Sequence, residues 1–379
     1  MDRFYFDHNA STPVSPEVLE ALTPALGEVY GNASSIHHHG QAAKQRLEAA
    51  RSQVARLIHA QPREIVFLSG GTEADNLAIF GTVRYSTRER KHVITSAIEH
   101  PAVLAACAQL EREGVEVTRV GVGSDGLVSP DDIRRALRPG TVLISVMHAN
   151  NELGVIQPIA EIARIAREAG VPLHSDGVQA VGKLAVDVEA LGADLYALTG
   201  HKIYGPKGAG ALYVREGTRL GAIQFGGHHE RDRRPGTENV PGAVGLGAAA
   251  EWFHDNLEAE TARLRALRDR LEAGILARVP CAGVNCANAP RTPNTSNICF
   301  AGLEGEALVI ALDLRGFAVS GGAACSSGAV EPSHVLTAIG LKPEQARASI
   351  RFSLGRSNNA EQVDALIDAV AAIAVQHGR

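Results

Sequence analysis

Two polar residues follow predicted strands at positions from which they could act together on one heterocyclic ring. Asp176 comes directly after VPLHS (171–175), and Lys202 follows DLYAL (194–198) within TGHKIYGPKG. A carboxylate can keep a ring nitrogen protonated, and a lysine amine can form an imine with an aldehyde. Singly, each residue has an ordinary explanation, as a helix cap or a solvated side chain. Together they indicate the two protein groups that pyridoxal-phosphate (PLP) chemistry requires.

A phosphate could bind where SGGTEADN (69–76) joins a predicted strand to a predicted helix. Gly70 and Gly71 permit a tight turn, and Thr72 stands at the helix start, where free N–H groups and the helix dipole attract anions. Glycine turns of this kind are more often structural, and the segment lacks the GxxxxGK(S/T) spacing of a nucleotide P-loop. Thr199 and His201 flank Lys202 and could reach the same phosphate.

Cys325 lies in VSGGAACSSGAVEPS (319–333), where small residues on both sides predict a weakly structured loop. Such a loop suits a thiol that must reach a substrate and then leave, and a cysteine that only packs does not need it. The five cysteines include no CxxC pair, so we expect free thiols in a reducing compartment. The four others are expected to be unreactive: Cys107, Cys281, Cys286 and Cys299.

The elements that would position these residues alternate between strands and amphipathic helices from about residue 16 to residue 214. This alternation predicts an α/β fold with a mainly parallel sheet and helices on both faces. In such sheets ligands collect beyond the carboxyl ends of the strands, which is where the polar residues stand. The predicted strands are Ile65–Leu68, His92–Ser96, Thr141–Met147 and Val171–Ser175.

A long helical pattern over Ala248–Val279 follows the glycine-rich segment PGAVGLG and predicts a helix that links two domains. We expect residues 16–254 to form the large domain, and residues 1–15 and 255–379 to form a smaller α+β domain that carries the cysteine loop. The run His37 to His39 is predicted to be a polar loop and not a metal site, and we expect no metal cofactor.

The net charge and the distribution of apolar residues indicate whether the chain binds nucleic acids or membranes. The formal net charge is -5 and the pI is near 6.3, which argues against direct nucleic-acid binding. No stretch approaches the roughly 20 apolar residues that cross a bilayer, and MDRFYFDHNA does not have the pattern of a secretion signal. We therefore expect a cytoplasmic enzyme that does not associate with membranes.

Several motifs, in order and spacing, resemble those of group I cysteine desulfurases of the NifS/IscS type. They are SGGTEADN, SAIEHPAV, MHANNELGV, SDGVQAVGK and TGHKIYGPKG, and the similarity runs from FDHNASTPV to SIRFSLGR. The resemblance covers nearly the whole chain. It implies the PLP fold type I, with a large domain built on a mainly parallel seven-stranded sheet, and PLP as the cofactor.

The resemblance also implies roles for individual residues. Lys202 would form the imine link to the cofactor, Asp176 would pair with the pyridine nitrogen, and Gln179 would hydrogen-bond the ring hydroxyl. His100 would stack on the ring, with capping a helix or packing in the core as its competing explanation. The remaining cofactor contacts would come from Asn151 and from a phosphate site built by Gly71, Thr72, Thr199 and His201, completed by Thr237 of a second subunit in a homodimer.

The substrate implied is L-cysteine, whose carboxylate Arg351 in SIRFSLGR would clamp with help from Asn32 in YGNASSIH. Cys325 would attack the substrate sulfur and become a persulfide, releasing alanine. Either His100 or the substrate's own departing proton could activate the thiol, because a free thiol is mostly protonated at neutral pH. Gly321 and Ala323 stand where the family pattern SSGSACTSG often has serine, a departure that affects hydrogen bonding within the loop.

Three alternatives remain open from the sequence. A selenocysteine lyase or an ordinary cysteine lyase would share the PLP motifs but would not need Cys325. A non-catalytic protein on the same fold would not need both Lys202 and Asp176. The sulfur acceptor is a third open question: an iron-sulfur scaffold protein, toward which Cys325 could act as a transient cluster ligand, a tRNA-thiolation carrier or a biosynthetic sulfur carrier.

Overall fold

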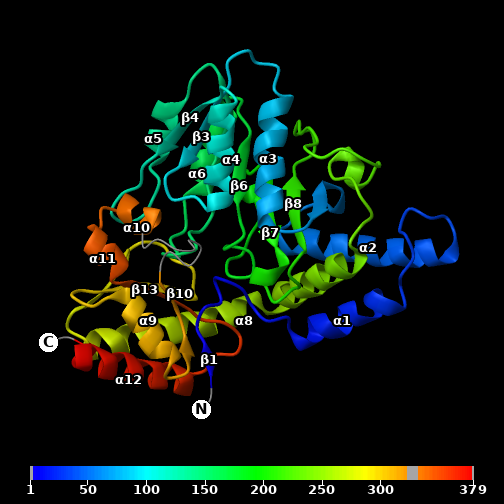
Figure 1. The fold of residues 1–379 in the computed structure, drawn as a ribbon. Helices are drawn as coiled ribbons and strands as arrows, with labels where there is room; N and C mark the ends of the chain where they lie inside the picture. Colours follow the sequence, from blue (N-terminus) through cyan, green and yellow to red (C-terminus); the bar gives the residue numbers. More distant parts are fainter. Residues whose placement is uncertain (1–2, 322–331, 378–379) are drawn as a thin grey trace.

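The computed structural model describes residues 3–321 and 332–377 of the chain. Figure 1 shows a large sheet with helices around it, a smaller layered body that contains both chain ends, and one long helix, α8, that runs between them. The main core of the smaller body is separate from the clusters of the large body, and one further cluster packs Ile98 and Met147 against Val335 and Leu336 of α10 (His334–Ala338). Residues of the smaller core come from both ends of the chain, including Phe6 and the segment from Leu264 to Ile373.

The large sheet has seven strands in the order β2-β8-β7-β6-β5-β3-β4. Strand β8 is antiparallel to both of its neighbours, and the remaining neighbours are paired in parallel. Most strands are buried along their whole length, as is typical of a sheet covered on both faces. Their bounds are β2 Ile65–Leu68, β3 His92–Ser96, β4 Glu116–Val120, β5 Thr141–Ser145, β6 Leu173–Asp176, β7 Leu195–Thr199 and β8 Gly210–Val214.

Helices cover both faces of this sheet because neighbouring strand residues point in opposite directions. In β3, Val93 packs with the core under α3 (Gly71–Tyr85) and α4 (Pro101–Arg112), whereas Ile94 packs with α5 (Pro130–Ala136) and α6 (Ile159–Glu168). The predicted α/β class with a mainly parallel sheet is confirmed. Helices α1 (Pro16–Gly27), α2 (His38–Leu57) and α7 (Val188–Leu191) complete the large body.

The smaller body is built on an antiparallel sheet in the order β12-β13-β10-β9 and a short parallel pair of β1 with β11. Helices α9 (Gly305–Asp313) and α12 (Ala360–His377) and the second half of α8 pack on its core. The strands are β1 Phe4–Tyr5, β9 Ala282–Val284, β10 Thr295–Phe300, β11 Phe317–Ala318, β12 Ser320–Gly321 and β13 Ser349–Ser353, and the short helices are α10 His334–Ala338 and α11 Pro343–Arg347.

Helix α8 spans Val240–Arg278, so it begins eight residues before the predicted start at Ala248. The glycine-rich segment that we expected to precede the helix is its first two turns. An added Cβ at Gly245 would lie 2.8 Å from Pro206, and one at Gly247 would lie 2.7 Å from Cα of Ala50 in α2. The glycines are therefore required by close packing, which offsets their low helix propensity.

The histidine run is also helical and not the predicted loop. His37 is the N-cap of α2, and its Nδ1 accepts a hydrogen bond of 3.3 Å from the Gly40 N–H. Smaller differences concern strand ends, since β5 stops at Ser145 and β6 includes Asp176 as its last residue. Within the described residues, none of the helices combines the length and the apolar character that crossing a membrane requires.

Candidate active site

Most of the predicted site residues lie along one edge of the large sheet, where β3, β5, β6 and β7 end. Parallel strands bring these carboxyl ends together, as the sequence pattern predicted. His100 follows β3, Asn151 follows β5, Asp176 ends β6, and the turn Gly200–Lys202 follows β7. The edge therefore gathers residues that are far apart in the sequence.

Lys202 ends a single 3-10 turn directly after β7 and is partly buried. Its Nζ donates hydrogen bonds to the main-chain oxygens of Asn9, at 2.5 Å, and of Ala10, at 2.8 Å. Its charge also acts on Asp176 and His100, and burial together with the charge of Lys202 lowers the pKa of His201 to about 4. The amine thus lies within electrostatic range of three other predicted site residues.

Asp176 is buried at the end of β6, and its Oδ1 accepts a hydrogen bond of 2.9 Å from the Val178 N–H. Burial raises the pKa of this carboxyl, and positive charge on His100 and Lys202 opposes that rise. A cationic ring nitrogen beside the carboxylate would oppose it further. Asp176 is therefore suited to stabilise a buried positive charge.

His100 is the N-cap of α4, and its Nδ1 accepts a hydrogen bond of 3.1 Å from the Ala102 N–H. Burial lowers the pKa of the imidazole, which the Asp176 carboxylate partly offsets. Because Nδ1 accepts, the neutral ring carries its proton on Nε2. Capping a helix was the competing explanation of this histidine, and the structure shows that contact, whereas stacking on a cofactor ring stays a prediction.

The predicted phosphate site is a tight turn at the start of α3. Gly70 is the N-cap, and a Cβ added there would lie 3.7 Å from Thr199 Oγ1. A Cβ on Gly71 would come within 2.6 Å of Val178 Cγ2, so the helix start approaches the loop after β6 very closely. Thr72 is exposed in the first turn, and the Thr199 hydroxyl donates to the Ala209 oxygen at 3.3 Å.

A residue without a predicted role, Asn9, joins most of these groups. Its main-chain oxygen accepts from Lys202 Nζ and from Gln179 Nε2 at 2.9 Å, and its Oδ1 accepts from Lys183 Nζ at 3.1 Å. Its Nδ2 donates to the Asn151 oxygen at 3.1 Å. Asn9 lies within FDHNASTPV, a segment that marked the start of the similarity and that shows neither helical nor strand periodicity.

Lys183 is a second residue that the sequence did not indicate. Its amine is buried and hydrogen-bonds to Gln179 Oε1, so it fixes the amide of Gln179 with Nε2 toward Asn9. Burial and the charge of Lys202 lower the pKa of Lys183. A neutral amine is the form that such a site favours.

Arg351 reaches the site from β13 of the smaller body. Its Nη1 donates to the Asn151 oxygen at 3.0 Å, and its Nη2 pairs with Asp7 Oδ1 at 2.6 Å. The guanidinium is almost completely buried. Arg351 and Lys202 are therefore joined to the same short segment, residues 7–10, and the two bodies meet at the site.

Other predicted residues lie elsewhere or outside the described residues. The loop that contains Asn32 joins α1 to α2, at the end of the molecule far from β13, so Asn32 does not reach Arg351 of its own chain (Figure 1). Thr237 is exposed and follows Gly236, whose φ is +99°. Cys325 belongs to residues 322–331, outside the described residues. His201 Nδ1 lies 3.3 Å from the Ser11 hydroxyl.

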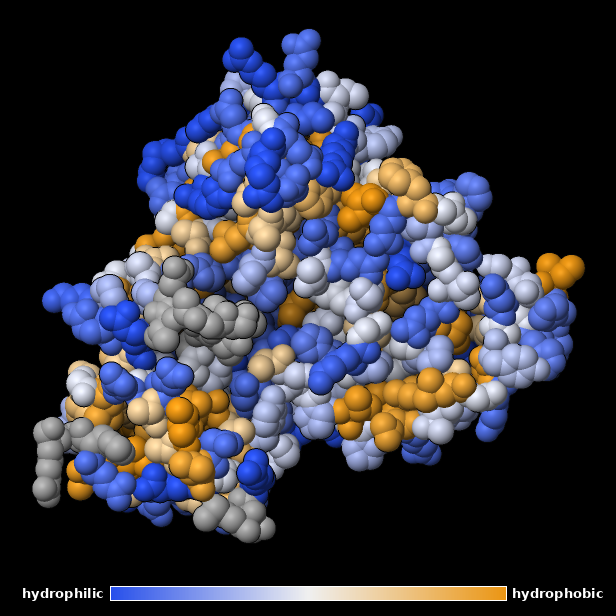
Figure 2. All heavy atoms as spheres, in the orientation of Figure 1, coloured by the Kyte–Doolittle hydropathy of each residue, from blue (hydrophilic) through white to orange (hydrophobic). Residues whose placement is uncertain are grey.

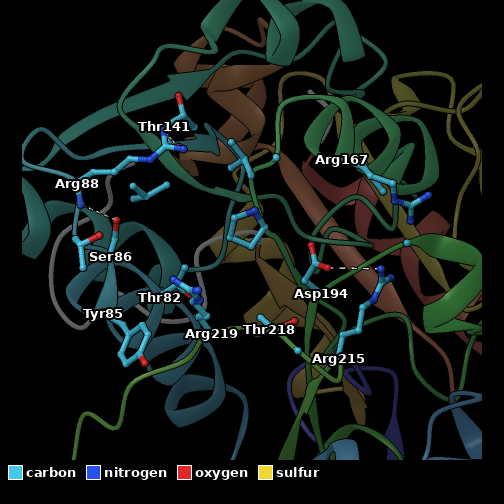
Figure 3. Close-up of a pocket in the computed structure, with 18 of the residues that line it drawn as sticks. Thr82, Tyr85, Ser86, Arg88, Thr141, Arg167, Asp194, Arg215, Thr218 and Arg219 are labelled. Carbon is cyan, nitrogen blue, oxygen red and sulfur yellow. Dashed lines mark hydrogen bonds and ion pairs between the residues drawn. The ribbon is translucent and has the colours of Figure 1, made fainter.

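A cavity of about 890 Å³ lies at the opposite edge of the sheet and contains none of the predicted residues. It is bordered by Thr141 at the start of β5 and by Asp194 just before β7. Figure 3 shows Arg88, Arg167 and Arg219 around it, with Arg215 paired to Asp194 at 3.6 Å. This cavity is separate from the edge that carries Lys202 and Asp176.

Comparison with known proteins agrees with this arrangement. The family model for aminotransferase class-V matches residues 4–366. The chain is 50% identical to the cysteine desulfurase IscS of Anaeromyxobacter dehalogenans, over 95% of this chain and 89% of that protein. It is 47% identical to cysteine desulfurase IscS of Methanosarcina thermophila, over 97% of this chain and 90% of that protein.

Solved structures show the same likeness. A NifS-like protein superimposes with a TM-score of 0.92 at 34% identity, covering 99% of this chain and all of the other. SspA in complex with cysteine superimposes with a TM-score of 0.83 at 37% identity, over 92% and 98% of the two chains. The chain therefore belongs to the aminotransferase class-V family and, within it, to the cysteine desulfurases.

Proposed function

We propose that the protein is a PLP-dependent cysteine desulfurase that converts L-cysteine to L-alanine and keeps the sulfur as a persulfide on Cys325. The observation that carries this proposal is the convergence of Lys202, Asp176 and Arg351 on one edge of the sheet. An amine, a buried carboxylate and a buried guanidinium are the groups needed to hold an aldehyde cofactor and an amino-acid carboxylate.

The residues present fit PLP. The Gly71 turn has no room for a side chain next to Val178, as expected where backbone N–H groups must approach a phosphate closely. In this proposal the turn holds the phosphate together with Thr72, Thr199 and His201, His100 contacts the ring, and Gln179 binds the ring hydroxyl. Asp176 would supply the buried negative charge beside the ring nitrogen. When bound, PLP provides an electron sink next to the substrate α-carbon.

In this proposal, Arg351, Lys202 and His100 have separate roles. Arg351 binds the substrate carboxylate and fixes the orientation of the amino acid relative to the sheet edge. Lys202 Nζ takes the α-proton, and the Asn9 and Ala10 carbonyls hold this amine in place. Neutral His100 carries a proton on Nε2 and can donate it while Nδ1 stays bound to the helix start.

Sulfur leaves through Cys325. Its thiolate forms an S–S bond with the substrate sulfur while the carbon–sulfur bond breaks, and the carbon product gains protons and departs as alanine. The described residues on either side of the segment 322–331 support this role of Cys325. Ser320 in β12 pairs with Arg351, so the chain enters the segment 322–331 beside the carboxylate site. It returns at Ser333, whose hydroxyl donates to buried Glu152 at 2.6 Å.

Mass spectrometry of the enzyme after reaction with L-cysteine, without reductant, tests the proposal. One added sulfur atom is expected on the peptide that contains Cys325, with an equal amount of alanine. Burial raises the pKa of Cys107 to about 12 and of Cys286 to about 11, so these thiols should stay protonated and unmodified. Sulfur on another cysteine, or alanine without a persulfide, would remove Cys325 from the mechanism.

We further propose that the active species is a homodimer in which Thr237 and Asn32 act in the site of the neighbouring subunit. Helix α1 and the loop after it expose Leu19, Leu26, Tyr30 and Ile36, and Figure 2 shows apolar side chains gathered over α1. Exposed apolar groups of this number favour burial against a second copy. Asn32 lies in the same loop, which explains how it could serve a site that it does not reach within its own chain.

The persulfide must pass to an acceptor. We propose a protein acceptor such as an iron-sulfur scaffold in the cytoplasm, because a transferable sulfur atom on a cysteine is the form that another protein thiol can take up by exchange. Trapping of mixed disulfides with sulfur-loaded enzyme would identify it. We also propose that the two bodies correspond to the predicted domains, residues 16–254 and residues 1–15 with 255–379.

A further inference from the structure

The guanidinium of Arg351 is already bound to a carboxylate of its own chain. Asp7 Oδ1 lies 2.6 Å from Nη2, across 344 residues of sequence. Asp7 sits directly after Phe6, a core residue of the smaller body, and forms an isolated bridge with Ser353. Backbone pairing therefore fixes the position of Asp7 next to the end of β13.

Within this ion pair, Asp7 is the partner that is nearer to solvent. The Asp7 side chain is 18% exposed, whereas that of Arg351 is 5% exposed. On the inner side, Nη1 donates to the Asn151 oxygen, and Nε is buried without an acceptor among the described residues. A ligand carboxylate that arrives from solvent thus meets Arg351 at the place that Asp7 holds.

The surroundings explain why a carboxylate is needed there in the resting protein. Burial lowers the pKa of Lys183, and the charges of Lys202 and Arg351 lower it further, so the Lys202 and Arg351 cations share one poorly hydrated region. Asp7 offsets part of this charge. An amino-acid carboxylate would offset the same charge, and the displaced Asp7 side chain, which is already 18% exposed, would turn toward solvent and be hydrated there.

We infer that Asp7 is a specificity-determining residue that occupies the carboxylate position on Arg351 and is displaced by the carboxylate of the substrate. This inference rests on the proposed function. Asp7 weakens the binding of every amino acid, because the ligand carboxylate must first displace Asp7 from Arg351. An amine without a carboxylate cannot displace Asp7 and so gains no binding energy from Arg351. The affinity for the substrate is therefore lower, but the buried Arg351 is ion-paired when no substrate is bound.

The test compares the wild-type holoenzyme with Asp7→Asn. Equilibrium binding of L-alanine is measured by calorimetry, and kcat and KM are measured with L-cysteine. Because the asparagine amide does not compete as an anion, L-alanine should bind about tenfold or more tightly and the KM for L-cysteine should fall, with a smaller change in kcat. Binding of cysteamine, which is cysteine without its carboxylate, should not change.

Two further variants control the comparison. Asp7→Glu restores a carboxylate and should return L-alanine affinity toward the wild-type value. Asp364→Asn removes an exposed ion pair with Arg270 far from the site and should change the binding of neither L-alanine nor cysteamine. Equal or weaker L-alanine binding by Asp7→Asn would overturn the inference and make Asp7 a group that only orients Arg351. A wild-type enzyme that forms no alanine from L-cysteine would instead refute the proposed function.

Discussion

At the scale of single side chains, Lys202 has one chemical rival nearby, the buried amine of Lys183. Lys183 is held by Asn9 Oδ1 and Gln179 Oε1, which direct it away from the role of a second catalytic amine. Lys202→Ala should therefore lose the visible absorption of bound cofactor and all turnover, measured by spectroscopy and alanine release. Lys207→Ala, an exposed change in the same segment, should behave as the wild type. Multiple turnovers by Lys202→Ala would contradict the assignment.

Cys325 separates a desulfurase from a lyase that expels the heteroatom with the cofactor alone. Cys325→Ala should keep the cofactor absorption but stop alanine formation from L-cysteine, because the four cysteines among the described residues pack in hydrophobic cores or hydrogen-bond to Ser124 and Gln345. Cys107→Ala is the matched control, since that thiol is buried between α4 and the sheet. Undiminished alanine release by Cys325→Ala would favour the lyase.

At the scale of elements, the start of α3 can pack closely against the loop after β6 because Gly71 has no side chain. Gly71→Ala should push the turn away from Val178 and weaken PLP binding by roughly tenfold, because the N–H groups would no longer point at the phosphate. Cofactor release during dialysis measures this. Gly27→Ala, where a Cβ meets open space at the end of α1, is the control, and equal retention by both variants would exclude the role.

The turn after β5 is tied to α10 by Glu152 and Ser333, and this link should make stability depend on pH. Burial raises the pKa of Glu152 to about 7, so the folded protein favours the protonated acid. This contribution to the free energy of unfolding is fully present below pH 4.5, the pKa of Glu152 in the unfolded chain. It is lost as the pH rises through 7, and the total loss is roughly 3 kcal/mol at most.

Glu152→Gln should remove this loss, so its urea midpoint should fall less than that of the wild type between about pH 5.5 and pH 8. The control is Glu111→Gln, because Arg119 holds the pKa of Glu111 below its usual value and keeps it ionised throughout this range. A Glu152→Gln profile parallel to the wild type would show that the carboxyl does not titrate there.

The sequence predicted the large sheet and the edge where Lys202 and Asp176 lie, because apolar runs and the polar residues after them are local signals. It misplaced the start of α8, since the glycines before Ala248 are chosen for contacts with Pro206 and Ala50 that no local pattern reveals. Asn9 and Asp7 were missed for the same reason. Their partners are 193 and 344 residues away, and the segment that carries them has no periodicity.

At the scale of the whole molecule, the proposed exchange of Thr237 between subunits can be tested by mixing two defective chains. Thr237→Glu should repel the phosphate of the neighbouring site, whereas Lys202→Ala disables its own site. In a mixed dimer, the site with intact Lys202 receives intact Thr237 from its partner, so activity should reappear on mixing. Light scattering confirms that dimers form. If Thr237 acts within its own chain, mixing restores nothing.

The long separation between Asp7 and Arg351 has a consequence for biogenesis. Residues 4 to 10 leave the ribosome long before residues 317 to 353, yet β1 pairs with β11 at Phe317 and Ala318, and the Asp7 contact needs β13. The large sheet can form while synthesis continues, but residues 4 to 10 have to wait for β11 and β13. Stable cofactor loading is therefore expected only after β13 has been synthesised, and nascent chains that stall before residue 349 should fail to retain PLP.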